Sequence, residues 1–399
     1  MRDVVIVDGC RTPFGKKGGG LKGFAASELG GLCVKALMER TALYERGGAV
    51  DSLIAGMAIS DTKSKATARY ISLLAGLPYE VSATFVEMQC GSAITSLNHA
   101  AWKIRMGISD IAVVGGVESH SNIPVGFATD TIPYRDRPTP LSRHLSPIAE
   151  QDTSMVQNSD KMAARWGVSR EECDGFAVRS QQRLQQAYAK GITGDEIIPV
   201  TVPATRKTPE IIVSKDEHPR PEVTYEKISR MPPLFPGGVT TAANASGTND
   251  GAAFLLVMTA EKAKELGYTP YARWIGCAHA GIQADYMGVA ASYSNLKAAK
   301  QLGLKLRDFD VFESNEAFAA QQLAVIKDMQ DATGEIIDET KWNPNGGAIA
   351  IGHPNAASGA RITMFAMKQL EQTGGRYGSI SSCCGGGQGS TAIIENLRR

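Results

Sequence analysis

Short runs of aliphatic residues recur along the chain and alternate with stretches of helical length, and this alternation constrains the fold most. The runs lie at 4–7 (VVIV), 111–117 (IAVVGGV), 254–258 (FLLVM), 272–281 (ARWIGCAHAG) and 308–314 (DFDVFES). Runs of this length between helical stretches are typical of buried strands in an α/β architecture. We therefore expect an α/β protein whose last strand lies near 377–382.

The segment from His120 to about Gly247 interrupts this alternation. It is rich in Pro, Arg and Asp and includes PYRDRPTPLSRHLSP at 133–147. Such a stretch predicts a large irregular insertion wrapped over one face. Since 399 residues exceed what a single hydrophobic core holds, we expect two or three domains.

Charge and cysteine usage exclude several classes of protein. The 42 Lys and Arg residues nearly balance the 41 Asp and Glu residues, so no field marks a nucleic-acid or anionic-membrane partner. The 7 cysteines include no C-x-x-C pair, which argues against a disulfide framework and against a metal site. No signal peptide or apolar run of membrane-spanning length is present. We expect a soluble cytoplasmic protein.

Cys90 lies directly before a helical pattern, because Ile94, Leu97, Ala101 and Ile104 follow 3–4–3 spacing. The free N–H groups at a helix start favour thiolate over thiol and can bind an oxyanion. The alternative is that Cys90 is one more small buried hydrophobe.

Three further segments carry groups that suit cysteine chemistry. His353 lies between Gly352 and Pro354, a rigid setting that can present an imidazole to a cysteine, although a lone histidine is more often structural. The run SSCCGGGQGST at 381–391 can aim backbone N–H groups at negative charge; a phosphate loop is the alternative, but no G-K-[ST] follows. Asn315 precedes a helical run, where an asparagine is ordinarily an N-cap.

Taken in order, these segments resemble the thiolase family, whose pattern is a nucleophilic cysteine near residue 90, then N-E-A-F-A, G-H-P and C-x-G-G-G. The resemblance covers nearly the whole chain. It extends to 11–15 (RTPFG), 115–121 (GGVESHS), 216–220 (DEHPR), 244–253 (NASGTNDGAA) and 278–281 (AHAG).

The resemblance implies a thiolase fold with two similar α/β domains in a five-layered α-β-α-β-α arrangement. The N-terminal domain would comprise 1–120 plus 248–270, a CoA-binding loop domain 121–247, and the C-terminal domain 271–399. It also implies acyl transfer through an acyl-cysteine, which cleaves 3-ketoacyl-CoA or condenses acyl-CoAs, as in fatty acid β-oxidation. Acyl-CoA would be the substrate, with no permanently bound cofactor, and the protein would form a homodimer or homotetramer.

By the same resemblance, Cys90 would be the nucleophile, His353 its base and Cys383 the acid/base at the α-carbon. Cys384 would fall at the variable position and point away. Asn315 would hold a water beside His353, and the backbone N–H groups of Cys90 and Gly385 would form a second oxyanion site. Arg220 would lie near the CoA nucleotide, Ser246 near the pantetheine, and Met155 and Phe318 beside the thioester.

The chain departs from the family pattern around two of these groups. Glu87 and Ala93 replace an asparagine and a glycine near the nucleophile, and Asn355 and Ala356 replace an apolar residue and a glycine after G-H-P. Because these positions border the acyl pocket, we expect altered acyl selectivity in favour of short or polar-tailed chains.

Three other functions compete with this one. A nicotinamide dehydrogenase is suggested by Gly18, Gly20 and Gly23, but the first glycine lies about ten residues beyond the strand, which a dinucleotide turn does not accommodate. A low-activity thiolase-like protein that binds CoA or lipid has no need of all four catalytic groups. A related condensing enzyme more often pairs its cysteine with two histidines.

Overall fold

The structure, a computed structural model, describes residues 2–128, 140–206 and 208–399. The strands are β1 (Val4–Arg11), β2 (Gly15–Lys16), β3 (Ser52–Gly56), β4 (Ser82–Val86), β5 (Ile111–Ser119), β6 (Val200–Val202), β7 (Ile211–Val213), β8 (Asn249–Thr259), β9 (Ala272–Gly281), β10 (Val311–Ser314), β11 (Tyr377–Cys384) and β12 (Gln388–Asn396). The helices are α1 (Ala26–Thr41), α2 (Thr67–Leu74), α3 (Ser92–Arg105), α4 (Met155–Trp166), α5 (Arg170–Ala189), α6 (Tyr225–Ile228), α7 (Ala260–Glu265), α8 (Ala290–Leu302), α9 (Ala319–Thr333), α10 (Ala348–Ile351) and α11 (Ser358–Thr373).

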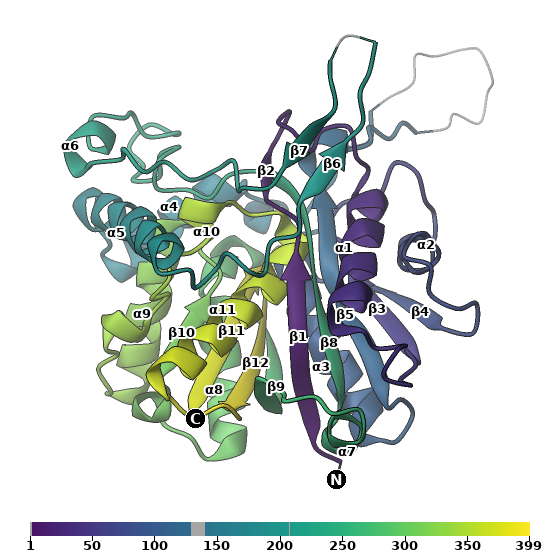
Figure 1. Ribbon diagram of the computed structural model, residues 1–399. Helices are drawn as coiled ribbons and strands as arrows, with labels where there is room; N and C mark the ends of the chain where they lie inside the picture. Colours follow the sequence, from purple (N-terminus) through teal and green to yellow (C-terminus); the bar gives the residue numbers. More distant parts are fainter. Residues whose placement is uncertain (1, 129–139, 207) are drawn as a thin grey trace.

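The main sheet is continuous but consists of two halves with the same pairing pattern. Its strand order is β10-β11-β12-β9-β1-β8-β5-β3-β4, and β1 meets β9 over only three register positions, Val4 to Ile6. In the first half β3 and β5 are parallel, and β8 then runs antiparallel to both β5 and β1. In the second half β10 and β11 are parallel, and β12 runs antiparallel to both β11 and β9. The chain therefore contains two similar α/β units, which lie side by side in Figure 1.

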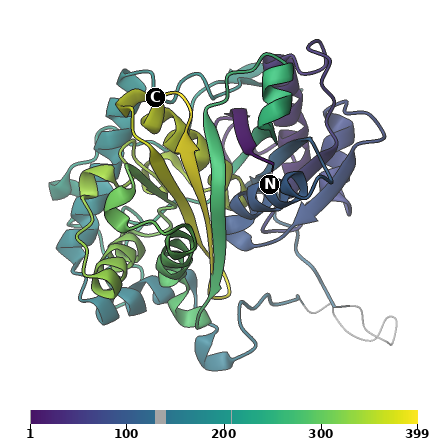
Figure 2. The same ribbon diagram turned by 90° about the horizontal axis from the view of Figure 1, so that it is seen from below.

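Helices cover both outer faces of the sheet halves and fill the space between them. One buried cluster packs α1 and α2 against the first half, and another packs α8 and α9 against the second. The central cluster joins α3 and α11 to strands of both halves, such as β8 and β12. These are the five layers, α-β-α-β-α, expected for the fold; Figure 2 shows the two halves from below.

The architecture places the ends of several elements at one edge of the molecule. The two central helices α3 and α11 begin just after Cys90 and His353 respectively. At the carboxyl ends of parallel strands lie His120 after β5, Asn315 after β10 and Cys383 near the end of β11. Strand ends beside helix starts are where α/β proteins hold their ligands.

Three sequence expectations about elements were wrong in detail. The strand near 377–382 is not the last one, because β12 follows it after a tight turn. The insertion is less irregular than its composition suggested, since it contains the long helices α4 and α5; residues 133–139 of its Pro-rich stretch lie outside the described residues. Asn315 is not a helix cap: α9 begins four residues later, at Ala319, with Phe318 as its N-cap.

Candidate active site

Cys90 lies on a sharp turn that the preceding residues hold in place. Gln89 has a φ of 47°, a left-handed conformation that costs free energy in a residue with a side chain. Oε1 of Glu87 accepts hydrogen bonds from the backbone N and from Nε2 of Gln89, at 2.8 and 2.7 Å. Ser92 Oγ links the turn to the start of α3 by accepting from the Met88 N–H at 3.0 Å. The exposed Glu87 thus holds the turn that presents the thiol.

The thiol of Cys90 faces the imidazole of His353. Sγ lies 3.1 Å from Nε2, although 263 positions separate the two residues in sequence. On the other side of the ring, Nδ1 lies 2.6 Å from the hydroxyl oxygen of Ser358, the first residue of α11. With Nδ1–H donating to Ser358, Nε2 keeps a lone pair and can take the proton of the Cys90 thiol.

Burial sets the resting charge of this pair. It raises the pKa of the Cys90 thiol well above its usual value, and repulsion from Cys383 and Glu118 adds to the rise. Burial also lowers the pKa of His353 to about 3. Both groups are therefore neutral near pH 7, and the expected preference for thiolate at the helix start was wrong, because burial outweighs the helix terminus. Such a pair forms its nucleophile only as the proton moves to the base.

Asn315 places an amide beside the same imidazole. Its Nδ2 lies 3.4 Å from His353 Nε2, and its side chain is fully buried. Its Oδ1 has no hydrogen-bond partner among the described residues. An unpaired buried oxygen is costly unless a water or ligand completes it. This fits the expectation that Asn315 holds a water next to His353.

The end of β11 brings two further cysteines, Cys383 and Cys384, to the region of Cys90. A Cβ built on Gly91 would lie 2.4 Å from Cys384 Sγ, so Cys384 packs against the turn that carries Cys90. Cys384 is thus a packing residue of this turn, and its place outside the chemistry stays a prediction. Cys383, on the opposite face of the strand, is buried in the outer cluster with α8 and α9, and burial raises its pKa to about 12.

Gly385 lies against the same turn, as an oxyanion site built from its backbone requires. A Cβ there would lie 3.0 Å from Cγ of Gln89, the residue before Cys90. Because Gly385 has no side chain, its peptide group can approach that of Cys90.

Alkylation of the cysteines can distinguish the effect of solvent exposure from the effect of the thiol pKa. Cys90 and Cys277 are the only partly exposed cysteines, whereas the other five are buried. We expect limiting iodoacetamide to label these two first, and acetyl-CoA to protect Cys90 alone. Because the pKa of Cys90 is raised, its labelling rate should still be rising at about pH 9. Peptide mass spectrometry measures both; a rate that levels off near pH 6, or protection of Cys277, would contradict this.

Glu118, at the end of β5, anchors the loop that carries His353. Its carboxylate accepts from the backbone N–H groups of Ala58, Ile59 and Ala356 at 3.0, 3.1 and 3.4 Å. Burial raises its pKa to about 8. Sequence reasoning assigned no role to Glu118, Ser358 or Gln89. Glu118 lay inside a recognised motif, but only the folded chain reveals its three partners.

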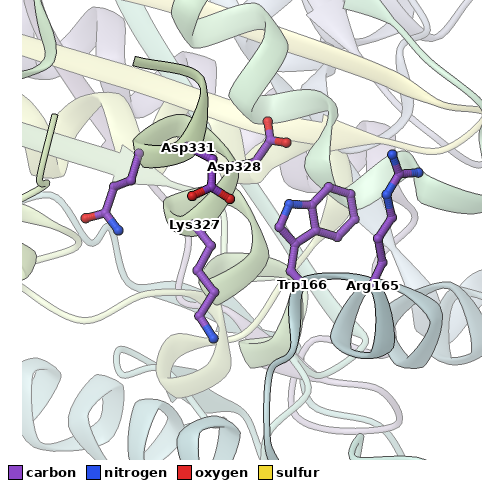
Figure 3. Close-up of a pocket in the computed structure, with 6 residues that line it drawn as sticks. Arg165, Trp166, Lys327, Asp328 and Asp331 are labelled. Carbon is purple, nitrogen blue, oxygen red and sulfur yellow. The ribbon is translucent and has the colours of Figure 1, made fainter. Parts of the chain in front are cut away.

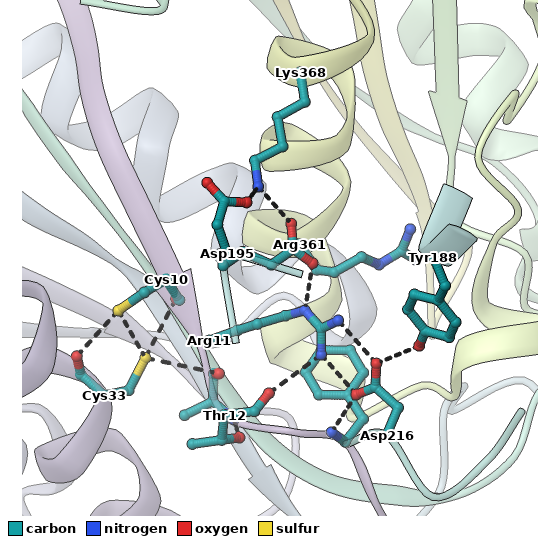
Figure 4. Close-up of polar contacts among 12 residues, drawn as sticks. Cys10, Arg11, Thr12, Cys33, Tyr188, Asp195, Asp216, Arg361 and Lys368 are labelled. Atoms are coloured by element: carbon teal, nitrogen blue, oxygen red, sulfur yellow. Dashed lines mark hydrogen bonds and ion pairs between the residues drawn. The ribbon is translucent and has the colours of Figure 1, made fainter. Parts of the chain in front are cut away.

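A buried guanidinium fastens the insertion to the first sheet half. Arg11 is fully buried; its Nε donates to Glu196 at 2.6 Å and its two terminal nitrogens donate to Asp216 at 2.7 and 2.9 Å (Figure 4). Tyr188 donates to the same Asp216 at 2.6 Å. Arg220 follows Asp216 by four residues, and its side chain makes no hydrogen bond or ion pair with the described residues. Its charge is thus available to an anion.

Two of the expected CoA-binding residues lie together. The segment with Ser246 bridges to the start of α9, where Ser246 N donates to Ala317 O at 2.9 Å and Ala245 pairs with Phe318. Phe318 is half-buried within an otherwise buried stretch. Met155 is half-buried at the start of α4.

A surface hollow elsewhere in the described ranges carries no comparable chemistry. A hollow between α4 and α9 is lined by Arg165, Trp166, Lys327, Asp328, Gln330 and Asp331 (Figure 3). Lys327 is paired there with Glu172, and no thiol or imidazole faces the hollow. Within the described ranges, no group of three or more His, Cys, Asp or Glu side chains could hold a metal ion. Among the helices of those ranges, none has the length and apolar character that a bilayer crossing requires.

The glycines that resemble a dinucleotide motif do not form one. Gly18 lies in a turn after the two-residue strand β2, and the helix α1 begins only at Ala26. A dinucleotide turn joins a strand directly to its helix. The dehydrogenase alternative therefore has no structural support.

Comparison with known proteins supports one family. The model of the thiolase N-terminal domain matches residues 4–261, and that of the thiolase C-terminal domain matches 268–396. The chain is 39% identical to β-ketoadipyl-CoA thiolase of Pseudomonas putida over the full length of both proteins. It is 38% identical to 3-ketoacyl-CoA thiolase of Bacillus subtilis, over 99% of this chain and 100% of that protein. The crystal structure of the Bacillus anthracis acetyl-CoA acetyltransferase superposes with a TM-score of 0.91 at 35% identity, over 99% of both chains.

Proposed function

The chain belongs to the thiolase family, and on that premise we propose that Cys90, His353, Cys383 and Asn315 are its catalytic residues. The protein is an acyltransferase that acts on CoA thioesters by Claisen chemistry. The observation that carries our assignment is the 3.1 Å approach of Cys90 Sγ to His353 Nε2. A protein that only binds CoA or lipid would have no use for that pair.

In the acylation step, Cys90 attacks the thioester carbonyl while its proton passes to Nε2 of His353. The negative charge on the carbonyl oxygen is stabilised by the backbone N–H groups of Cys90 and Gly385. The bond to CoA sulfur then breaks, and His353 returns the proton to the departing thiolate. Concerted proton transfer suits a neutral pair, because it creates no buried thiolate in advance.

In the carbon–carbon step, Cys383 exchanges a proton with the α-carbon. For cleavage, Cys90 attacks the 3-keto carbonyl and gives its proton to His353, the bond between C2 and C3 breaks, and the thiol of Cys383 protonates the departing enolate of acetyl-CoA. For condensation, Cys383 removes a proton from the methyl group of acetyl-CoA. In cleavage, where His353 carries the proton taken from Cys90, the enolate oxygen accepts hydrogen bonds from its Nε2 and from a water that Asn315 holds; the unpaired Oδ1 of Asn315 supports this role.

We place the CoA molecule along the insertion. Arg220 would bind its nucleotide phosphates, supported by the free charge of that side chain. Ser246 would accept the pantetheine, with Phe318 and Met155 beside the thioester. The proposed domains, 1–120 plus 248–270, 121–247 and 271–399, follow the same division, with the CoA-binding loop domain between the two catalytic halves.

CoA-dependent cleavage of 3-ketoacyl-CoA tests this assignment. We expect purified protein to release acetyl-CoA from acetoacetyl-CoA, and Cys90→Ser to remove that activity while keeping the fold. Formation of an acetylated peptide that contains Cys90 would support the covalent route. Wild-type protein that neither cleaves nor becomes acetylated would overturn it.

The oligomer and the compartment are further parts of the proposal. The edge strand β4 exposes 47% of Phe85, and on one side no other strand of the described residues pairs with it, which favours association with a second copy into a dimer or tetramer. Light scattering of the purified protein checks this, and a monomer at micromolar concentration would contradict it.

The seven unpaired cysteines suit the reducing cytoplasm. Cell fractionation tests that location.

A further inference from the structure

Two polar residues, His120 and Asn355, meet beside the catalytic pair. His120 Nε2 lies 2.8 Å from Asn355 Oδ1. Because a carbonyl oxygen only accepts, Nε2 carries the proton of this hydrogen bond. His120 follows β5 and Asn355 precedes α11, so the contact joins the end of a strand to the start of the central helix.

Both residues are close to the reacting groups. Asn355 is two residues from His353, and the next residue, Ala356, donates its N–H to Glu118. His120 follows Glu118 by two residues and is near enough to His353 to lower its pKa by repulsion. Any acyl group on Cys90 therefore extends from a site that this pair borders.

The remaining polar side-chain atoms of His120 and Asn355 have no hydrogen-bond partner among the described residues. Asn355 Nδ2 carries two N–H groups, and neither has a partner among the described residues. His120 Nδ1 likewise has none there, although His120 is only 7% exposed. The N–H groups of Asn355 placed this way discriminate between substrates, because a ligand without a matching acceptor leaves them unpaired.

We propose that His120 and Asn355 form a specificity pair that selects acyl chains bearing an oxygen acceptor, such as a terminal carboxylate, over plain alkyl chains. Asn355 Nδ2 donates to that oxygen, and His120 orients the amide by donating to its Oδ1. This inference rests on the proposed function. Glu87 does not take part, since its carboxylate is engaged by Gln89.

A matched pair of substrates tests the proposal. 3-Oxoadipyl-CoA and 3-oxohexanoyl-CoA have chains of equal length that end in a carboxylate and a methyl group respectively. We expect the wild type to favour the first by about tenfold or more in kcat/KM. Asn355→Leu and His120→Met should each reduce that ratio by about tenfold. The double variant should lose little more, because the two residues act as one hydrogen-bonded unit.

Two controls distinguish an effect on substrate selectivity from a purely structural role of the contact between His120 and Asn355, which we call a latch. His99→Met makes the same replacement on α3, about 10 Å along the helix from its first residue, Ser92, and should leave the ratio unchanged. Acetylation of Cys90 by acetyl-CoA, which has no tail, should stay within about twofold of the wild type in His99→Met.

Each outcome decides between the two claims. If the wild type cleaves both substrates equally, or if the variants keep its preference, the specificity pair is overturned and the proposed function stands. If Asn355→Leu lowers both rates alike and also slows acetylation, the contact is only a latch. If the wild type cleaves neither these substrates nor acetoacetyl-CoA, the proposed function fails and this inference fails with it.

Discussion

Replacing Cys383 by alanine should leave acetyl transfer to Cys90 intact and stop carbon–carbon chemistry. Acylation needs the thiol and the imidazole, whose reacting atoms are 3.1 Å apart, and the N–H groups that stabilise the oxyanion, and Cys383 supplies none of these. Removal of Cys383 also removes a repulsion that raises the pKa of Cys90, so acylation should not slow. Cleavage and condensation should both fall by roughly 10²–10⁴, the usual range for a positioned acid or base.

Rapid mixing with acetyl-CoA should therefore show a burst of free CoA and an acetylated enzyme that persists. Deuterium exchange from solvent into acetyl-CoA should disappear, because it requires a base at the methyl group. The raised pKa of Cys383, about 12, keeps it protonated at rest, ready to protonate the enolate in the cleavage direction.

Cys384→Ala is the matched control, since it removes the next thiol of the same strand. The sulfur of Cys384 packs against Gly91 and is not aligned with Cys383, because neighbouring side chains of a strand point to opposite faces. We expect this variant to be less stable but to retain deuterium exchange. Loss of exchange in Cys384→Ala together with its retention in Cys383→Ala would move the acid/base by one residue.

The fold class could be predicted from sequence because strand and helix patterns are local. The runs at 4–7, 111–117, 254–258 and 272–281 all lie in strands, and the run at 308–314 contains β10 (Val311–Ser314). Composition misled for the insertion, where the capped helices α4 and α5 lie within a polar segment. The final strand β12 was missed because its run follows the glycines of the turn at 385–387.

Residue identities at the site could be proposed, but not their electrostatics. Local sequence shows a cysteine before a helix and so suggests a low pKa. Burial comes from packing of distant elements and reverses that conclusion for Cys90. The role of Ser358 was equally hidden, since its contact with His353 depends on the turn between them. The link between His120 and Asn355 joins residues 235 positions apart and needed the fold.

His353→Ala should make acylation strongly dependent on pH. In the wild type, the pKa of His353 is about 3, so the neutral base is fully present from about pH 5 upward and the acylation rate should be nearly flat to about pH 8. Without the imidazole, only free thiolate of Cys90 can react. Its raised pKa makes that form scarce at pH 7, and its fraction grows about tenfold per pH unit.

At pH 7 the loss in acylation rate should be roughly 10²–10⁴, and the gap to the wild type should narrow steadily toward pH 9. The CoA burst, measured by rapid quench across that range, gives the slope. Ser358→Ala is the control, because it keeps the imidazole and removes only the partner at 2.6 Å. Losing that hydrogen bond should slow acylation about 10-fold to 100-fold without changing the flat profile. A pH-independent His353→Ala variant, or a thiolate absorbance in the wild type at pH 6, would mean that the resting pair is already ionised and that His353 acts as an imidazolium.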